Sequence, residues 1–118
     1  MNRVIKIEEL VEWILENRIK GVFSGHPDGI ALQVKKSVDQ NVFCYSFDSE
    51  ERLNGVVVGE HTHDGEIWIK DILITDSSVL KKFMKHYINL YPDKKIVGTC
   101  RGRVRIFNDP KKLLRRIK

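Results

Sequence analysis

Cysteine and proline are scarce in this chain of 118 residues, which contains two of the first and three of the second. Two cysteines are too few for the disulfide frameworks that stabilise small secreted domains. Cys44 and Cys100 each stand within a strand-like run of residues, so we expect buried free thiols rather than a disulfide bond. Internal repeats and low-complexity segments are also absent, which excludes a repeat array.

Long hydrophobic runs are missing as well, because no apolar stretch approaches the length of a membrane span. The opening residues, MNRVIKIEELVEW, carry acids where a secretory signal would be apolar. Hydrophobic residues nevertheless make up 42% of the chain, which is too many for a disordered protein and enough for one modest core. We therefore expect one soluble, cytoplasmic domain over residues 1–118, without a membrane partner.

Negative charge is almost missing from the C-terminal part of the chain, although the formal net charge of the whole is only +5. From Lys94 onward there are ten basic residues and one acid, Asp109, which gives a net charge of +9. The preceding part holds eleven basic and fifteen acidic residues, a net charge of −4. Such segregation bears on surface potential and on partners rather than on fold.

The C-terminal basic residues have a spacing that predicts a phosphate-binding surface. Alternate arginines share one face of a strand, and the last basic residues share the polar face of a short helix. Arginine binds phosphate through its planar fork, so nucleic acid or the phosphates of coenzyme A are candidate partners. The alternative is a solvated edge strand and helix, charged against aggregation. The candidate residues are Arg101, Arg103, Arg105, Lys111, Lys112, Arg115 and Arg116.

Hydrophobic periodicity predicts an α+β domain with a mixed, mainly antiparallel sheet and flanking helices. Asp76, Ser77 or Ser78 can cap the central helix, whose expected apolar stripe is Leu80, Phe83, Tyr87 and Leu90. A loop is expected over residues 24–29 because Gly, Pro and Asp follow one another there. We expect helices over residues 7–19, 75–92 and 108–118, and strands over 30–34, 42–47, 55–63, 66–74 and 94–107, the last bent at Gly98 or Gly102.

The segment NGVVVGEHTHDGEIWIKDILI predicts a β-hairpin that turns at Asp64 and Gly65. An Asp-Gly pair favours a two-residue type I′ turn, which would set His61 opposite Trp68. Gly59, inside the first strand, predicts a bulge or a close approach of another backbone.

The two histidines before the turn also admit a metal-site interpretation. His61 and His63 share one face of a strand and could chelate a metal ion. A site needs three or four ligands, and no matching Cys or His pair stands nearby. We therefore interpret HTHD as the tip of a surface hairpin and expect no metal.

The order of elements from residue 54 to residue 107 resembles the GNAT superfamily of acyl-CoA N-acyltransferases. The resemblance rests on LNGVVVGE and EIWIKDILI as a central hairpin, SSVLKKFMKHYINLYP as the following helix, and KKIVGTCRGRVRIF as the strand after it. It is strongest with short, divergent members carried by bacterial viruses, which would place the protein in a host cytoplasm. In this family the strands before and after the helix are parallel and splay apart, and acyl-CoA lies between them.

The resemblance implies where acetyl-CoA or another acyl-CoA would bind. DILIT would meet the pantetheine arm through its backbone, and DSSV at the helix start would hold the pyrophosphate. Glu60 would lie on the strand that often offers a general base, and the alternative is a solvated, inert side chain. The implied cofactor-binding residues are Leu73, Ile74, Thr75, Ser77, Ser78 and Val79.

The sequence departs from the family pattern at the phosphate loop. Active members place a basic residue or Gln and then spaced glycines before this helix, whereas this chain has TDSSVL, with Asp76 where a phosphate would approach. The late tyrosine that often acts as general acid has no match, and we expect Tyr87 and Tyr91 to be packing residues. Three functions therefore stay open: an N-acyltransferase or a derivative that has lost catalysis, a nucleic-acid-associated binding protein, and a virion or host-interaction protein that uses the fold as a scaffold. The sequence does not indicate an oligomeric state.

Overall fold

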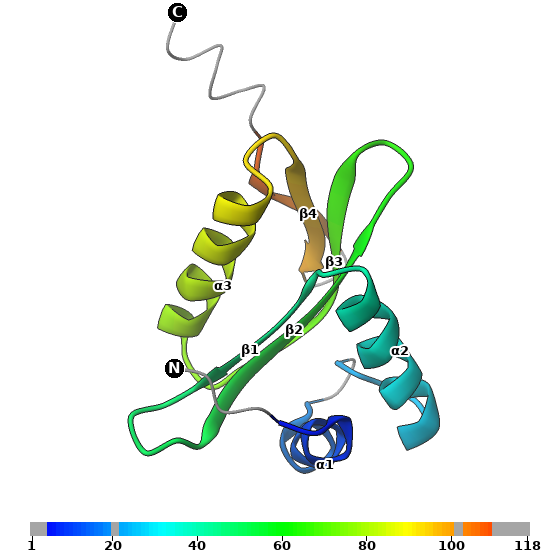
Figure 1. Ribbon diagram of the computed structural model, residues 1–118, viewed down its shortest axis with the longest axis vertical. Coiled ribbons are helices and arrows are strands. Elements are labelled where there is room, and N and C mark those ends of the chain that lie inside the picture. Colours follow the sequence, from blue (N-terminus) through cyan, green and yellow to red (C-terminus); the bar gives the residue numbers. More distant parts are fainter. Residues whose placement is uncertain (1–4, 20–21, 101–102, 110–118) are drawn as a thin grey trace, which may run out of the picture.

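The computed structural model describes residues 5–19, 22–100 and 103–109. These residues form three helices and five strands (Figure 1). In chain order the elements are α1 (Ile7–Asn17), α2 (Pro27–Asp39), β1 (Phe43–Phe47), β2 (Leu53–His61), β3 (Glu66–Ile74), α3 (Ser77–Leu90), β4 (Lys95–Cys100) and β5 (Arg103–Asn108).

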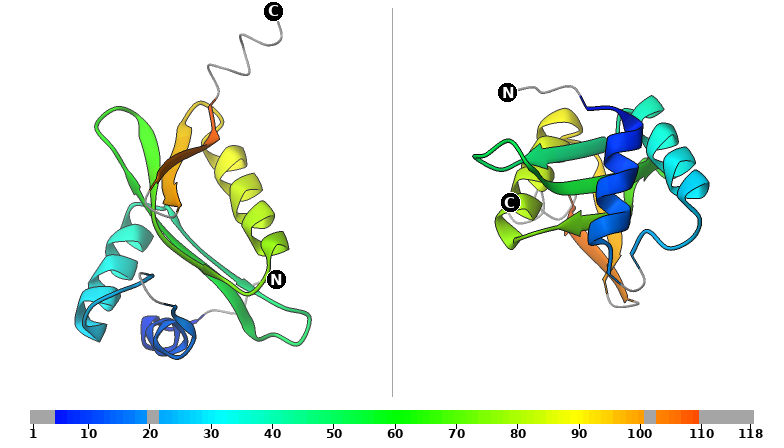
Figure 2. Two further views of the ribbon diagram at one scale, coloured as in Figure 1. Left: turned by 180° about the vertical axis from the view of Figure 1, so that it is seen from behind. Right: turned by 90° about the horizontal axis from the view of Figure 1, so that it is seen from below.

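The five strands form a single sheet in the order β1-β2-β3-β4-β5. Neighbouring strands are antiparallel except β3 and β4, which are parallel because α3 carries the chain back between them. Helix α3 covers one face of the sheet, and α1 and α2 lie against the other (Figures 1 and 2). The fold class is therefore α+β with a mixed, mainly antiparallel sheet, as the sequence predicts.

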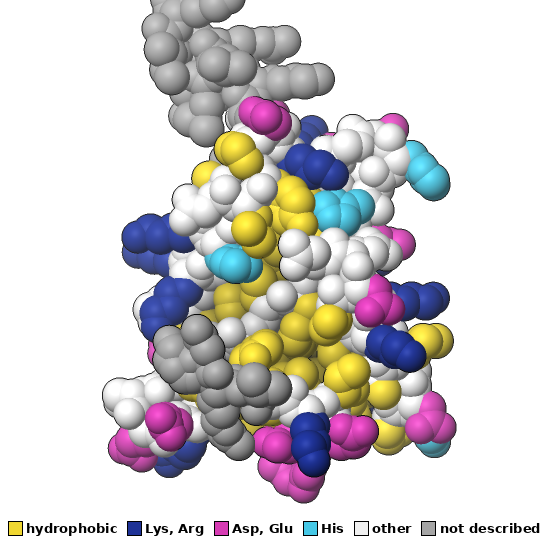
Figure 3. All heavy atoms as spheres, in the orientation of Figure 1, with side chains coloured by type: hydrophobic (Ala, Val, Ile, Leu, Met, Phe, Trp, Pro, Cys, Tyr) yellow, Lys and Arg dark blue, Asp and Glu magenta, His cyan; other side chains and the backbone are white. Residues whose placement is uncertain are grey.

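Each face of the sheet has its own hydrophobic core, because successive side chains of a strand point to opposite faces. Val56 and Val58 of β2 belong to the same core as Ile14 of α1, whereas Val57 belongs to the core that includes Phe83 of α3. None of these five side chains is more than 3% exposed. In Figure 3, apolar side chains gather between the α3 and α2 layers, with charged side chains around them. A one-residue slip of β2 would exchange the two cores, so burial fixes the register.

Cys44 and Tyr87 lie in the core beneath α3, as the sequence predicts. Burial raises the pKa of the Cys44 thiol to about 11, so this free thiol stays protonated at neutral pH. The Tyr87 hydroxyl donates to the Val42 carbonyl at 2.6 Å, and burial raises its pKa as well. The Tyr91 hydroxyl donates to the Asn41 carbonyl at 2.8 Å. Both tyrosines thus fasten the end of α3 to the segment that enters β1.

Helix α2 occupies a segment that the sequence analysis predicts as a loop followed by the strand IALQV, and that prediction was wrong. Pro27 takes the first turn and His26 caps the helix, its Nδ1 accepting the backbone N–H of residue 28 at 3.1 Å. Ile30, Val34 and Ser37 then recur at helical spacing and are buried. A five-residue apolar run carries no clear period of its own, so only the capping signal distinguishes helix from strand.

The hairpin between β2 and β3 has a three-residue loop in place of the predicted two-residue turn. The Thr62 N–H donates to the Glu66 carbonyl at 2.9 Å, and within the loop only Gly65 has a positive φ, of 75°. A type I turn followed by a left-handed glycine has this pattern. The longer loop shifts the register by one residue, so that Trp68 lies opposite Glu60 rather than His61.

The strand predicted near the C-terminus is two strands, β4 and β5, which pair antiparallel. The chain reverses direction between β4 and β5, whereas the prediction had a single bent strand. This reversal gives β4 a second neighbour, so its backbone groups are paired on both edges. Gly98 does not bend the strand away; it allows close packing, since a Cβ there would lie 2.9 Å from the Phe107 ring. The final helix, predicted from residue 108, lies outside the described residues beyond Asp109.

Helices α1 and α3 form where they are predicted, with small differences. Asp76 is the cap of α3, but the buried stripe is Val79, Phe83 and Tyr87. The predicted Leu90 is 45% exposed. The stripe begins one residue earlier than predicted because Val79 packs where β2 has a glycine, so the helix start approaches the sheet closely. None of the described helices is long and apolar enough to cross a membrane.

Candidate functional site beside the strand bulge

Strands β3 and β4 separate halfway along β3. Their parallel pairing runs from Glu66 and Lys95 to Ile69 and Gly98, while β3 continues to Ile74. Beyond the last pair, no strand within the described ranges pairs with this edge of β3. An unpaired edge of this kind has N–H and C=O groups that an extended ligand can bind.

A β-bulge lies in β3 where the two strands separate. Val58 and Gly59 are neighbours in β2, yet they pair with Asp71 and Ile69, so Lys70 has no partner on β2. A bulge bends its strand and redirects a side chain. The bulge predicted at Gly59 is therefore confirmed, and its extra residue lies on the facing strand.

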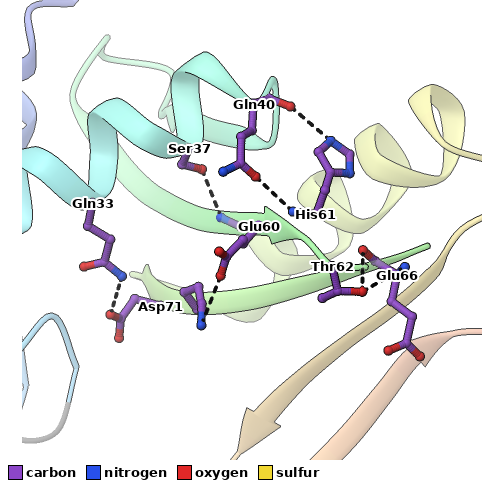
Figure 4. A network of polar contacts seen from close by, with 10 residues as sticks. Gln33, Ser37, Gln40, Glu60, His61, Thr62, Glu66 and Asp71 are labelled. Carbon is purple, nitrogen blue, oxygen red and sulfur yellow. Dashed lines mark hydrogen bonds and ion pairs between the residues drawn. The ribbon is translucent and has the colours of Figure 1, made fainter. Parts of the chain in front are cut away.

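A polar stripe on α2 and its C-cap residue faces this bulge. Gln33, Ser37 and Gln40 lie three or four residues apart and point toward β2 and β3 (Figure 4). Gln33 Nε2 donates to Asp71 Oδ2 at 3.0 Å, and the buried Ser37 hydroxyl oxygen accepts the Gly59 N–H at 3.0 Å. The Gln40 side chain accepts the backbone N–H of the last β2 residue at 3.0 Å. These bonds fix the distance between the helix and the bulged strands.

A pocket of about 270 Å³ opens between α2 and the bulge. It is slightly smaller than the sites of roughly 300–1,000 Å³ that hold drug-sized ligands. Val58, which is buried, and Leu32, which is 54% exposed, supply its apolar surface. Lys36, Lys70 and Glu60 give it two positive charges and one negative charge, a net charge of +1. The other lining residues are Gly29, Gln33, Ser37, Gln40 and Gly59.

Glu60 and Lys70 form an ion pair at the pocket, with 3.1 Å between Oε2 and Nζ. Both side chains are about half exposed, at 47% for Glu60 and 51% for Lys70. Exposed pairs contribute little to stability, about 0–1 kcal/mol, because water screens them. The pair is therefore easily opened by a ligand that offers both charges.

The start of α3, which the sequence analysis associates with pyrophosphate, is occupied by a carboxylate. The Asp76 side chain accepts the Ser78 N–H at 2.8 Å and also bonds to the Ser78 hydroxyl. These two bonds, the hydroxyl bond foremost, hold the Asp76 pKa below its usual value. The carboxylate therefore stays ionised at neutral pH and places a negative charge where an anion would bind the helix dipole.

The residues predicted to bind acyl-CoA are divided between the cores and the surface. Leu73 lies in the α1 and α2 core, and Val79 in the α3 core, each less than 8% exposed. Ile74 packs against the α3 core, and the Thr75 N–H donates to a β2 carbonyl at 2.9 Å. Ser77 is exposed, and Ser78 donates to the Asp76 cap. Of these predicted contacts, the backbone on the open edge of β3 beyond Ile69 is the part that suits an extended ligand.

His61 links β2 to the segment after α3 and to the end of α2. Lys94 Nζ lies 3.0 Å from His61 Nδ1. His61 Nε2 lies 3.0 Å from the Gln40 carbonyl (Figure 4). An ammonium group can only donate, so Nδ1 accepts and the proton resides on Nε2. The Tyr91 ring packs edge-on against the imidazole, with 5.1 Å between ring centroids. Among the described residues, no three His, Cys, Asp or Glu side chains gather as a metal site.

Most of the predicted phosphate-binding residues lie outside the described part of the chain. Arg103 and Arg105 belong to the edge strand β5, and Arg101 and the basic residues from Lys111 onward are not described. Val104 and Ile106, which alternate with the two arginines, are 64% and 43% exposed. The phosphate-binding surface therefore stays a prediction from the sequence.

The α2 pocket is the feature that the sequence analysis missed. The pocket could not be predicted while this segment was expected to be a strand, because a strand would not place positions 33, 37 and 40 on one face. A helix does place them on one face. The sequence signal that could have identified the helix was its start, where His26 is followed by Pro27 and an acid.

Comparison of the chain with protein-family models finds no match, and comparisons with curated proteins and with solved structures find none either.

Proposed function

We propose that this chain is a GNAT-like domain that has lost acyl-CoA-dependent catalysis and acts as a ligand-binding domain. The observation that carries the proposal is the Asp76 carboxylate at the start of α3, bound to its own helix N-terminus. The GNAT-like part of the proposal is supported by the open edge of β3 beyond Ile69 and by the order of elements around it.

The Asp76 cap opposes a pyrophosphate in two ways. It occupies the Ser78 N–H that an anion would use, and it repels a negative ligand directly. The helix start, TDSSVL, contains no glycine. Its side chains therefore limit how closely a phosphate can approach the other N–H groups. The α2 pocket does not depend on this helix start, since it is lined by α2 and its C-cap Gln40 together with β2 and β3.

Thermal unfolding of the wild type and of Asp76→Ser, each with and without acetyl-CoA, tests this proposal. Serine keeps a good helix cap but removes the charge. We expect about 1 mM acetyl-CoA to leave the wild-type midpoint within about 1 °C and to raise that of Asp76→Ser by a few degrees, because only a bound ligand stabilises the native state. Asp64→Ser, which removes a carboxylate at the exposed hairpin tip, should behave like the wild type. A clear wild-type shift would contradict the proposal.

The alternative function is nucleic-acid binding through the basic C-terminal part, and the segregation of +9 from −4 favours it. Arg103→Ala with Arg105→Ala should weaken binding to a short DNA duplex and reduce the slope of log K against log salt by about 2, one per phosphate contact. Fluorescence anisotropy at several salt concentrations measures both quantities. DNA affinity that does not change with salt concentration, or that is the same in the double variant, would exclude this surface as the DNA-binding site.

A further inference from the structure

We propose that the pocket between α2 and the bulge of β3 binds a small zwitterion with an apolar side chain, such as a free aliphatic amino acid. This inference rests on the proposed ligand-binding function and names the ligand class. It follows from the arrangement of charge in the pocket, from its apolar surface and from its size.

The charges in the pocket match both ends of a zwitterion. Glu60 offers a carboxylate for the ligand's ammonium group, and Lys70, at the bulge, offers an ammonium group for the ligand's carboxylate. Lys36 on α2 adds a second positive charge, so the net charge of +1 favours a ligand that carries a carboxylate. A ligand with both charges exchanges partners with the Glu60–Lys70 pair and leaves neither Glu60 nor Lys70 without an opposite charge.

A ligand with a single charge cannot make this exchange. An amine would pair with Glu60 and release Lys70, and a carboxylic acid would do the reverse, so one protein charge would lose its partner beside the ligand. The pair itself is half exposed and weakly held, so opening it costs little when both charges are replaced. The pocket therefore distinguishes an amino acid from its amide and from its N-acylated form.

The remaining surface suits a short aliphatic side chain. Val58 is buried beside the bulge, while Leu32 on α2 leaves 54% of its surface in water, which an apolar ligand would cover. The volume of about 270 Å³ suits a molecule smaller than drug-sized compounds. The hydrogen bonds of Gln33 and Ser37 to the strands hold the walls in place before a ligand arrives, which reduces the entropy lost on binding.

The experiment is a thermal-shift series on the full chain with L-leucine, L-leucinamide and N-acetyl-L-leucine at equal concentration and neutral pH. L-Leucine carries both charges, and each of the other two lacks one of them. We expect leucine at millimolar concentration to raise the midpoint by about 2 °C or more, and its two derivatives to have less than a third of that effect. Equal shifts with all three compounds, or none with leucine, would overturn the proposal.

Variants locate the binding. Glu60→Gln and Lys70→Gln should each abolish the leucine shift while remaining folded, because both side chains are half exposed. The matched control is Lys95→Gln, which breaks the Glu66–Lys95 ion pair of 3.6 Å outside the pocket and should leave the shift intact. A leucine shift that survives Glu60→Gln and Lys70→Gln would place the ligand elsewhere and refute the assignment.

An acetyl-CoA arm in the same series separates this inference from the proposed function. A wild-type shift with acetyl-CoA contradicts the loss of acyl-CoA binding, whatever leucine does. No shift with leucine contradicts the ligand class, whatever acetyl-CoA does.

Discussion

Gly55→Ala is expected to destabilise the protein by about 1–3 kcal/mol, as overpacking of a filled core does. Gly55 lies in β2 beneath the first turn of α3, and a Cβ there would lie 2.5 Å from Val79 Cγ1. It would also lie 3.2 Å from side-chain atoms of Ile74 and Phe83, so the neighbours leave little room to move. Urea unfolding followed by circular dichroism measures the loss as a lower midpoint at constant slope.

The double variant Gly55→Ala with Val79→Ala tests the cause of this loss. Val79→Ala alone also destabilises, because it removes buried carbon from the α3 core. Together the two changes place one methyl where another was removed, so the combined loss should be smaller than the sum by about 0.5–3 kcal/mol. Gly29→Ala is the control, since nothing lies within 4 Å of a Cβ there and alanine favours the helix. Strict additivity would mean that Val79 does not limit the space at residue 55.

Asp71→Ala is the second change with a large expected effect, a loss of about 1.5–3 kcal/mol. Asp71 Oδ1 accepts the Phe23 N–H at 3.1 Å, and Oδ2 accepts Gln33 Nε2 at 3.0 Å. Phe23 is fully buried in the α1 and α2 core and has a positive φ of 48°, which the surrounding contacts must hold. Removing the carboxylate leaves the Phe23 N–H without its acceptor, and bonds to charged acceptors are the stronger ones. Urea unfolding again measures the loss.

Two milder changes divide the contributions of Asp71. Gln33→Ala removes only the side-chain bond and should cost about 1 kcal/mol. Asp71→Asn keeps an oxygen for the Phe23 N–H and should fall between Gln33→Ala and Asp71→Ala. Equal losses for Gln33→Ala and Asp71→Ala would show that the hydrogen bond from the Phe23 N–H to Asp71 contributes nothing to stability, contrary to the loss predicted for Asp71→Ala.

Strong local signals account for the parts of the fold that the sequence predicted correctly. The alternation of Phe43, Cys44 and Tyr45 and the capping side chain of Asp76 act over a few residues, so they can be read from the chain directly. The class of the fold followed from the order of such elements. The pairing of β5 with β4 did not follow, because it depends on a backbone edge that only the assembled sheet offers.

The candidate site depended most on non-local contacts, and the sequence analysis predicted it least well. Glu60 was named only as a possible general base, with an inert side chain as the alternative, and its partner Lys70 was not named, because the bulge that orients Lys70 arises from the pairing of two strands. Gln33 was assigned to a strand and Ser37 to the loop after it. Their common face on α2 was therefore not predicted. The cap of α3, by contrast, was narrowed from the sequence to Asp76, Ser77 or Ser78, and the structure identifies Asp76 as the cap on which the functional argument rests.

The most direct test of the account is an amide-resolved NMR titration of acetyl-CoA into the wild type and into Asp76→Ser. The account predicts no significant shifts in the wild type, and in the variant it predicts shifts at the N–H groups of Ser77, Ser78 and Val79 together with those of the open edge of β3. Wild-type shifts at these same amides would contradict it, because acyl-CoA would then bind despite the Asp76 carboxylate. Shifts in the variant at amides far from α3 and β3 would contradict the GNAT-like placement of the ligand.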